Sequence, residues 1–446
     1  MSSSSSSSSA PSSSSHSASS ASSPASSSAS SAAFPVSPVS AARPALRVPL
    51  VDLAAQYAEL KPALDEAVLR VLESGRYVLG PEVEAFEREL AAYLRQGAAS
   101  PESLGHGATA QASAGPYVVG VSSGTDALLA AAMGLGLGLG CGQGEPGSAA
   151  LTQPASCVGG EVVTTAFSFF ATPETAIRLG LRPVFADLEE DGFNADVDDV
   201  LAKLTDKTVA IVPVHLFGQR MAMDRLVATG LPVIEDAAQT LLPGLATQTR
   251  CATLSFFPTK NLGAAGDGGA VVTYDAALAD SLRVMRQHGS RPKYVHALWG
   301  GNFRLDPLQA AILRIKLGHL DRWQAARRQH AAFYHQALAP LQSAGVLRLP
   351  PSPEQAPEHV YHHFVIRAPR RDALRAQLAA RHIETELYYP LPLHLQPCLA
   401  QLGYRAGSLP RAEAAAAECL ALPVHANLSP AQLAAVSDAV LDFYRG

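Results

Sequence analysis

The chain of 446 residues is 48% hydrophobic and 16% charged, with a net charge of −5 at pH 7. This length exceeds one typical core, so we expect two domains and a tail. The charge balance excludes the basic footprint of nucleic-acid or membrane-surface binding, and no apolar run reaches the roughly 18 residues that span a bilayer. The five cysteines lack the Cys-x-x-Cys spacing of a zinc site, so we expect no metal and no disulfide scaffold. The composition therefore predicts a soluble intracellular protein.

Residues 1–45 consist almost entirely of Ser, Ala and Pro, a composition that cannot bury enough apolar surface to fold. The stretch contains Arg43 but no acidic residue, and organelle transit peptides share this Ser-rich, acid-poor composition. Two interpretations stay open. The tail is either a transit peptide, for which the scarcity of arginine favours the plastid, or an extension without an address, which leaves the protein in the cytoplasm.

Residues 46–318 alternate between short apolar runs and amphipathic stretches, which is typical of a mainly parallel α/β sheet sandwiched by helices. The expected strands are Tyr117–Val121, Glu161–Thr165, Pro183–Asp187, Val209–Val214, Pro232–Glu235, Thr253–Phe256 and Gly269–Thr273. The expected helices are Glu59–Glu73, Val83–Leu94, Asp126–Met133, Pro173–Leu179, Val197–Leu204 and Met223–Ala228. Low-complexity residues near 97–115 and 134–160 predict surface insertions in this large domain.

A smaller C-terminal α+β domain is expected over residues 319–446. Asp306-Pro307 predicts a helix start, with the aspartate as N-cap and proline at the first helical position. The helix behind it is expected to continue from an apolar face into a basic stretch around Arg327 and Arg328. Val360–Arg367 predicts a short strand within the small domain.

One lysine lies in unusual surroundings. Leu254–Phe257 is a short apolar run that predicts a buried strand ended by Pro258. Lys260 follows among apolar residues and glycines, as the only positive charge between Arg250 and Arg283. Desolvation lowers the pKa of an amine in such a place and makes it a nucleophile toward a carbonyl. The alternative is a loop lysine whose head group lies in water.

A helix start at Ser122–Leu128 directly follows an expected strand. Free backbone N–H groups at a helix N-terminus favour a phosphate site, with Gly124 allowing close approach and Ser123 and Thr125 supplying hydroxyls. An ordinary N-cap by Ser123 or Thr125 explains the same residues.

Two further strand ends carry residues suited to a cofactor. Glu235 and Asp236 lie at the carboxyl end of a buried strand, the edge where open α/β sheets bind ligands. A carboxylate there either holds a heterocyclic nitrogen protonated or complements a helix dipole. Phe167, Phe169 and Phe170 end another strand, where aromatic rings either stack on a ligand or fill the core.

Together these features are what pyridoxal phosphate requires: a phosphate cradle, a carboxylate, a stacking aromatic and a desolvated lysine. The lysine forms a Schiff base with the cofactor, and the acid keeps the pyridine nitrogen protonated so that the ring takes up electrons. The sequence therefore predicts a pyridoxal 5'-phosphate enzyme.

The same residues belong to a series of segments that closely resembles the DegT/StrS-type (DegT/DnrJ/EryC/StrS) sugar aminotransferases, which are fold-type-I pyridoxal-phosphate enzymes. The match covers about residues 48–446 apart from the insertions. In chain order the segments are Ser-Gly-Thr-Asp-Ala-Leu (123–128), Phe-Ser-Phe-Phe-Ala-Thr (167–172), His-Leu-Phe-Gly-Gln (215–219), Glu-Asp-Ala-Ala-Gln (235–239), Ser-Phe-Phe-Pro-Thr-Lys-Asn-Leu-Gly (255–263), Gly-Asp-Gly-Gly (266–269), Arg-Gln-His-Gly (286–289), Gly-Asn-Phe-Arg-Leu-Asp-Pro-Leu-Gln-Ala-Ala (301–311) and Tyr-Pro-Leu-Pro-Leu-His-Leu-Gln (389–396).

The resemblance implies a role for each matching residue. Lys260 would bind the cofactor covalently and move the substrate proton, Asp236 would pair with the pyridinium nitrogen, and Gln239 would contact the ring hydroxyl. Tyr389 and His394 lie in the segment that approaches the sugar in such enzymes, although a solvated loop histidine is an alternative for His394. The other implied cofactor contacts are stacking by Phe169, phosphate binding by Gly124, Thr125, Asp126 and Ser255, and phosphate binding by Asn302 from the neighbouring subunit of a homodimer.

The implied reaction is a ping-pong transamination from an amino acid, glutamate, to a nucleotide-linked keto sugar. Residues 389–396 are similar to members that act on 3-keto sugars. Two alternatives are a sugar dehydratase of the same fold, whose relatives carry histidine at the position of Lys260, and a non-catalytic regulatory relative. The chain departs from the family pattern in its two insertions and in a shortened segment between Gln239 and Ser255.

Overall fold

The structure is a computed structural model that describes residues 46–96, 115–138 and 159–445. The Ser-rich tail and nearly all of the two expected insertions lie outside the described residues. The described residues belong to one compact unit. No helix within them is long and apolar enough to cross a membrane.

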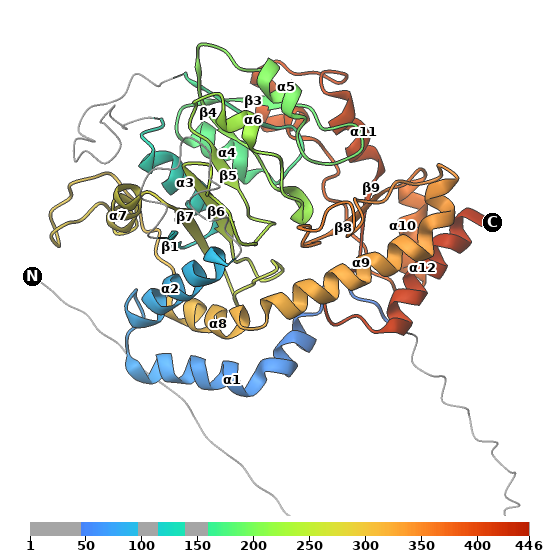
Figure 1. The fold of residues 1–446 in the computed structure, drawn as a ribbon, viewed down its shortest axis with the longest axis horizontal. Helices are drawn as coiled ribbons and strands as arrows, with labels where there is room; N and C mark the ends of the chain where they lie inside the picture. Colours follow the sequence, from blue (N-terminus) through green and yellow to red (C-terminus); the bar gives the residue numbers. More distant parts are fainter. Residues whose placement is uncertain (1–45, 97–114, 139–158, 446) are drawn as a thin grey trace, which may run out of the picture. The chain divides into compact units, whose positions relative to one another are not determined.

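Two sheets lie edge to edge at the centre of this unit (Figure 1). One has the strand order β3-β2-β4 and the other β5-β6-β7-β1, and the bridges Ile211↔Val233 and Val214↔Asp236 connect β4 to β5 in parallel. Among these strands only β7 runs against its neighbours, β1 and β6. The strands are β1 Tyr117–Val121, β2 Glu161–Thr165, β3 Arg182–Ala186, β4 Thr208–Val212, β5 Ile234–Asp236, β6 Cys251–Ser255 and β7 Gly269–Thr273.

The mainly parallel sheet is confirmed, and the strand bounds differ from the expected ones by no more than a few residues. The largest consequence concerns β6, because Leu254–Phe257 was expected to continue as a strand to Pro258. The strand instead ends at Ser255, where the ladder with Gly269 stops. Phe256 turns into the core, while Phe257 is left 51% exposed.

Helices cover both faces of the sheet, as expected for strands that are buried on each side. Valines that alternate along β1 and β2 pack on opposite faces: Val119 and Val162 pack toward α3, α4 and α7, Val118 packs toward α2 and α8, and Val163 packs toward α5 and α6. The helices of this region are α1 Leu53–Ser74, α2 Pro81–Arg95, α3 Gly124–Gly134, α4 Ala171–Arg178, α5 Val197–Ala202, α6 Asp224–Val227, α7 Ala276–Met285 and α8 Pro307–Leu317, with the 3-10 turn η2 Leu216–Gly218.

The C-terminal residues build a core of their own around an antiparallel pair of strands. The elements of the C-terminal region are α9 Leu320–Ser343, β8 Phe364–Arg367, α10 Arg371–Ala380, η3 Leu393–Leu395, η4 Pro397–Leu402, α11 Pro410–Glu418, β9 Cys419–Leu422 and α12 Pro430–Arg445. A further core joins Phe167 and Phe185 of the first region to Leu393 and Leu399. The division near residue 318 therefore stays a prediction.

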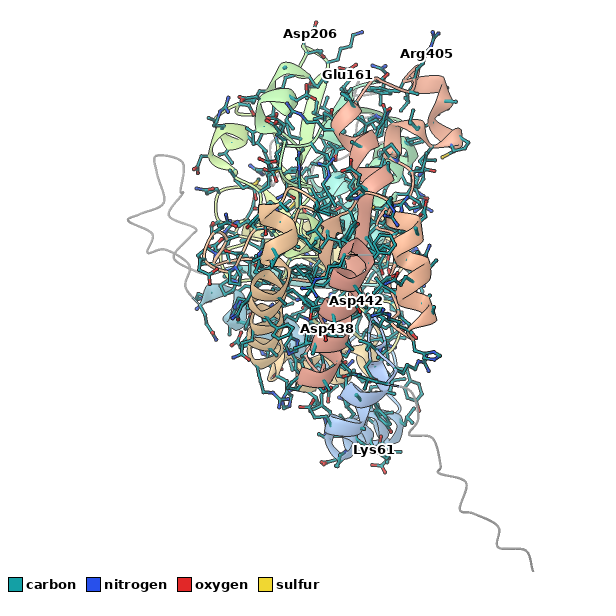
Figure 2. All side chains as sticks on the ribbon, turned by 90° about the vertical axis from the view of Figure 1, so that its right-hand side faces the viewer. Lys61, Glu161, Asp206, Arg405, Asp438 and Asp442 are labelled. Carbon is teal, nitrogen blue, oxygen red and sulfur yellow. The ribbon has the colours of Figure 1, made fainter. Side chains whose placement is uncertain are left out.

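The helix expected to run from Asp306 into the basic stretch is wrong in this form, because α8 ends at Leu317 and α9 begins at Leu320. Asp306 occupies the N-cap position, but its side chain caps no backbone group. Within the expected basic stretch Arg327 is buried, and its guanidinium donates to the carbonyl oxygens of Tyr361 and His362. Charged residues such as Lys61, Asp206, Arg405 and Asp438 lie on the outside instead (Figure 2).

Candidate active site

The predicted site residues follow the carboxyl ends of neighbouring strands. Ser122–Asp126 follows β1, Phe167–Thr172 follows β2, Asp236 ends β5, and Ser255 ends β6 just before Lys260. All four strands are parallel to one another within the connected sheets. Their carboxyl ends therefore meet at one edge, which places these residues around a common site.

Asp236 is the buried acid of this edge. Only 4% of its surface is exposed, and its Oδ2 accepts a hydrogen bond from the Thr172 hydroxyl at 2.7 Å. Its Oδ1 accepts from the N–H of Ala238 at 3.2 Å. Burial raises the pKa of this carboxyl, and the two hydrogen bonds and the charge of Lys260 oppose that rise. Asp236 is thus fixed in place and becomes most stable as a carboxylate when a cation lies beside it.

Gln239 links three segments at the same edge. Its Oε1 accepts from the backbone N–H of Phe217 at 2.8 Å, and its Nε2 donates to the Tyr389 hydroxyl at 3.0 Å. The structure therefore brings together Gln239 and Tyr389, which were predicted for the cofactor and the sugar respectively.

A close approach between α3 and β6 lies where the sequence predicts a phosphate cradle. Ser123 is the N-cap of α3, since its Oγ accepts from the N–H of Asp126 at 3.0 Å, and the Ser122 hydroxyl donates to Asp126 Oδ2 at 2.6 Å. A Cβ added to Gly124 would lie 2.6 Å from Ser255 Cβ. The side chain of Ser255 thus lies directly against the first turn of α3, where free N–H groups favour an anion.

Exchange of Gly124 for alanine is expected to weaken cofactor binding by about tenfold or more, because the added methyl group displaces either Ser255 or the first turn of α3. The measurement is a titration of the cofactor-free protein with pyridoxal phosphate. Gly318→Ala is the matched control, because a Cβ at that helix end meets only the Ile315 carbonyl oxygen, at 3.5 Å. Equal affinity of the Gly124→Ala and wild-type proteins would contradict the cradle.

Lys260 has the electrostatics of a nucleophilic amine. Burial lowers its pKa to about 8, and the negative charge of Asp236 only partly opposes this. Helix α8 supports the loop that carries it, since Lys316 Nζ donates to the Gly263 carbonyl oxygen at 2.7 Å and Gln309 Oε1 accepts from the N–H of Ala265 at 2.8 Å. Lys260 is half-buried in a loop, so its head group does not lie fully in water, which agrees with the lowered pKa.

The reactivity of Lys260 toward an aldehyde should therefore rise with pH up to about 8 and then level off. At pH 7 roughly a tenth of an amine with this pKa is neutral, against less than about one in a thousand for an ordinary lysine. The measurement is the rate at which cofactor-free protein reacts with pyridoxal phosphate from pH 6 to pH 10. The Lys260→Ala protein supplies the background from other amines, including Lys316, whose pKa burial also lowers to about 8. A rate that keeps rising to about pH 10 would contradict the prediction.

A second carboxylate and a histidine lie behind the site, and only the structure identifies their roles. Glu235, which the sequence left as a candidate beside Asp236, is fully buried and engaged: His215 Nε2 lies 2.9 Å from its Oε2, and Thr249 and the N–H of Ala246 donate to its Oε1. His215 Nδ1 faces the N–H of Met221, which fixes the tautomer with a proton on Nε2. This pair anchors the loop that presents Phe217 to Gln239.

The same contacts hold in place the segment between Gln239 and Ser255, which is shorter than the family pattern. Ala246 and Thr249 fold it onto Glu235, and Arg220 donates to the carbonyl of Gly244 at 3.0 Å. Strand β6 then pairs in register with β5 and β7. Within the described residues the shortened segment is compatible with a regular strand that leads to Ser255.

Three predicted residues are not joined to this cluster by a contact in the described part of the chain. Phe169 is 60% exposed, which leaves a ring face available for stacking. Asn302 accepts from Arg304 Nε at 2.6 Å and lies opposite Gln287. His394 is buried, with Nε2 3.1 Å from Glu413 Oε1, so its interpretation as a solvated loop histidine is wrong.

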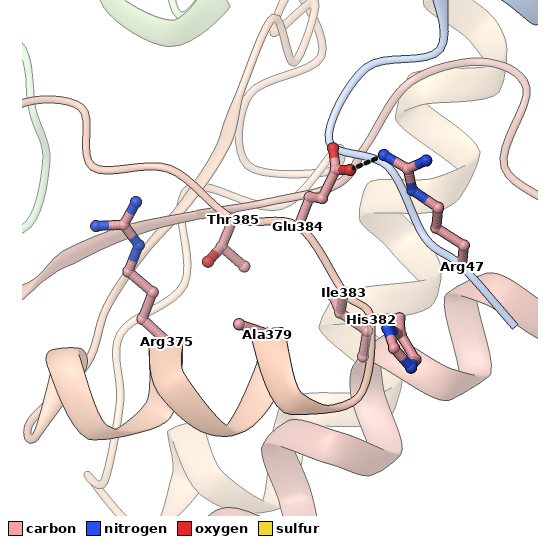
Figure 3. A pocket seen from close by; sticks show the side chains of 7 residues that line it. All are labelled: Arg47, Arg375, Ala379, His382, Ile383, Glu384 and Thr385. Carbon is pink, nitrogen blue, oxygen red and sulfur yellow. Dashed lines mark hydrogen bonds and ion pairs between the residues drawn. The ribbon is translucent and has the colours of Figure 1, made fainter. Parts of the chain in front are cut away.

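A separate hollow lies between the end of α10 and the start of the described chain (Figure 3). Its lining contains none of the predicted site residues, and its charges are already matched. Arg47 pairs with Glu384 at 2.7 Å, and Arg375 pairs with Glu386 at 3.3 Å. This hollow is therefore not a candidate for the predicted cofactor site.

The parallel sheet with a lysine, a buried acid and a glycine-serine cradle at its carboxyl edge defines a pyridoxal-phosphate enzyme of fold type I. The residues fit the cofactor: the absent Cβ of Gly124 opens the cradle, and Asp236 supplies a buried carboxylate. The chain belongs to the DegT/DnrJ/EryC1/StrS aminotransferase family, which it matches over residues 59–441, and a structure of similar fold was determined with pyridoxamine phosphate bound. The predictions of family, fold class, cofactor and enzyme class are confirmed.

The chain is similar to proteins that carry two kinds of name. It is 43% identical over 411 residues to the pleiotropic regulatory protein of Geobacillus stearothermophilus, covering 90% of this chain and 99% of the relative. It is 41% identical to the dTDP-3-amino-3,4,6-trideoxy-alpha-D-glucose transaminase of Streptomyces venezuelae, covering 89% and 96%. The crystal structure of S. venezuelae DesV is similar with a TM-score of 0.76 and 40% identity, over 90% of this chain and 99% of that one.

Proposed function

We propose that the protein transfers an amino group from an amino acid, glutamate, to the 3-position of a nucleotide-linked keto sugar. One observation carries this: Lys260, with its lowered pKa, follows Ser255 and lies within the field of the buried Asp236. A nucleophilic amine, an anion cradle and a fixed carboxylate at one sheet edge supply what transamination with pyridoxal phosphate requires. The similarity to a named 3-amino-sugar transaminase favours a 3-keto sugar as acceptor.

The cofactor, when bound, acts as the electron sink that makes the carbon next to nitrogen acidic. Each residue of this chain then has a defined task. Lys260 would hold the cofactor through its carbonyl carbon and would serve as the base that moves the substrate proton. Asp236 would keep a proton on the pyridine nitrogen, while Ser255, Thr125 and Asp126 would hold the phosphate. Gln239 would contact the ring hydroxyl, and Tyr389, whose hydroxyl accepts from Gln239 Nε2, would lie toward the sugar.

We also propose that two copies of the chain form a homodimer in which Asn302 serves the partner's phosphate site. Its support is that Asn302 is exposed and has no contact, in the described chain, with the residues around Lys260. Sedimentation velocity tests the dimer. Mixed dimers of a Lys260→Ala chain and an Asn302→Ala chain test the sharing, because such dimers regain one intact site only when Asn302 acts across the interface.

A regulatory role without catalysis is the alternative that the name of one relative raises. A protein that only regulates has no need of a lysine whose pKa burial lowers or of a glycine fitted against Ser255. The intact site therefore supports catalysis.

The deciding experiment has two parts. The purified protein is reduced with borohydride in the presence of pyridoxal phosphate, and the modified peptide is mapped. It is then assayed for glutamate-dependent amination of a panel of nucleotide-linked 3-keto and 4-keto sugars. We expect the cofactor on Lys260 and amination of a 3-keto sugar. No cofactor on Lys260 would refute the aminotransferase, and amination of 4-keto sugars alone would refute the proposed position.

A further inference from the structure

The segment Val360–His363 runs across the candidate site and is held there by backbone contacts. The N–H of Val360 donates to the carbonyl oxygen of Gly218 at 2.9 Å, and the N–H of His363 donates to that of Phe217 at 3.2 Å. Asn261, the neighbour of Lys260, donates from Nδ2 to the Val360 carbonyl oxygen at 3.3 Å. The segment is thus fixed to the lysine loop and to the loop that binds Gln239.

Gly218 makes this approach possible. Its φ is +101°, and a Cβ there would lie 2.7 Å from the backbone nitrogen of His362. No side chain separates the two backbones, so the position of His363 relative to Phe217 is set by main-chain packing rather than by adjustable side chains.

The imidazole of His363 is part of an aromatic stack. It lies over the ring of Tyr388 with 4.1 Å between centroids and 25° between planes, and the ring of Phe217 meets it edge-on at 5.9 Å. Tyr388 directly precedes Tyr389, whose hydroxyl is bonded to Gln239. His363 therefore contacts Tyr388, and the next residue, Tyr389, contacts Gln239, which is predicted to bind the cofactor.

The ring nitrogens of His363 differ from those of the other buried histidines near the site. Both nitrogens of His215 have partners, and His359 Nδ1 accepts from the N–H of Tyr361 at 3.0 Å. His362 Nδ1 is buried without a partner. Within the described chain, neither ring nitrogen of His363 has a hydrogen-bond partner. Neither nitrogen is completely buried either. The ring nitrogens are consequently left for a ligand or for solvent.

The charge state of His363 limits the kind of ligand. Burial, together with the positive charges of Lys260 and Arg327, holds its pKa well below the usual range. The imidazole is therefore neutral at neutral pH and has one donor and one acceptor nitrogen. Such a group suits hydroxyl and ether oxygens better than the carboxylates of an amino-acid donor, which favour cationic partners. Beside it, the half-buried Tyr388 ring offers apolar surface to a sugar, whereas the Phe217 ring is buried and only supports the imidazole.

We propose that His363 binds the sugar ring of the keto-sugar acceptor and helps to select it, with Tyr388 holding the imidazole in place. This inference rests on the proposed function. It assigns His363 to the acceptor half of the reaction and not to the amino donor or the nucleotide.

The test uses the full-length holoenzyme and three variants. His363→Phe keeps the aromatic stack and removes the ring nitrogens, His363→Gln keeps a donor and an acceptor, and His335→Phe is the matched control. The control residue packs edge-on against Phe364, with 5.7 Å between ring centroids, and makes no ring contact with Tyr388 or Phe217 among the described residues. KM is measured separately for glutamate and for the keto sugar identified in the panel. Binding of the amino-sugar nucleotide and of the nucleoside diphosphate alone is measured on borohydride-reduced protein, which cannot turn over.

We expect His363→Phe to raise KM for the keto sugar and Kd for the amino-sugar nucleotide by about tenfold to a hundredfold, since a buried polar contact is lost. KM for glutamate and Kd for the nucleoside diphosphate should stay within about twofold, and His363→Gln should restore part of the sugar affinity. Unchanged sugar affinity in His363→Phe, or equal losses for sugar and nucleoside diphosphate, would overturn the proposal. Failure of the proposed function is distinguishable, because the wild-type protein itself would then lack cofactor on Lys260 and sugar amination.

Discussion

Exchange of Lys260 for alanine is expected to abolish transamination, with a fall in turnover of at least about four orders of magnitude. The exchange removes both the nucleophile that binds the cofactor carbonyl and the base that moves the substrate proton, and the base alone contributes about 10²- to 10⁴-fold. The fold should persist, because the variant also removes an amine whose positive charge burial disfavours. The measurements are amino-sugar formation from glutamate and thermal unfolding of the two proteins.

Lys207→Ala is the control, because this exposed lysine lies at the far end of β4, before Thr208. Its turnover and unfolding temperature should match those of the wild type. Amino-sugar formation retained by Lys260→Ala would contradict the assignment of nucleophile and base to this residue, whereas a dehydratase would form no amino sugar in either protein. Loss of turnover together with an unfolded protein would show that Lys260 is needed for folding and would leave its chemical role to borohydride mapping.

The parts of the fold and site that the sequence predicted depend on local patterns. Valine-rich runs such as Tyr117–Val121 give their strands directly, because β-branched residues fit a sheet covered on both faces. The positions of Asp236, Ser255 and Lys260 in the site could be predicted from the sequence for a related reason. Each lies at or just after the carboxyl end of a strand, and parallel strands bring such ends to one edge.

What the sequence left undetermined depends on contacts between distant segments. His215 and Glu235 are 20 residues apart, and no pattern in either segment predicts that the histidine forms a hydrogen bond with the carboxylate. His363 and Tyr388 meet only because Gly218 admits the backbone of one segment against another. The helix break at Gly318 was missed because apolar spacing continues on both sides of it, and spacing alone does not locate an interruption.

Exchange of Asp236 for asparagine is expected to lower turnover by about a thousandfold, or about 4 kcal/mol of transition-state stabilisation. Asparagine has nearly the same shape and can accept the Thr172 hydroxyl through its oxygen, so the fold should be kept. The amide carries no negative charge, and it therefore cannot hold a proton on the pyridine nitrogen. The measurement is the glutamate half of the reaction, followed by 2-oxoglutarate release in a single turnover.

Thr172→Val separates the charge of Asp236 from its placement. It leaves the carboxylate and removes one hydrogen bond of 2.7 Å, so turnover should fall by only about tenfold. Cofactor should still be fixed on Lys260 in both variants, because neither exchange touches the amine. If Asp236→Asn lost no more activity than Thr172→Val, the carboxylate would act only as a hydrogen-bonded support. The proposal that Asp236 keeps the ring nitrogen protonated would then be wrong. A hundredfold gap between the two variants is what a charge at this position requires.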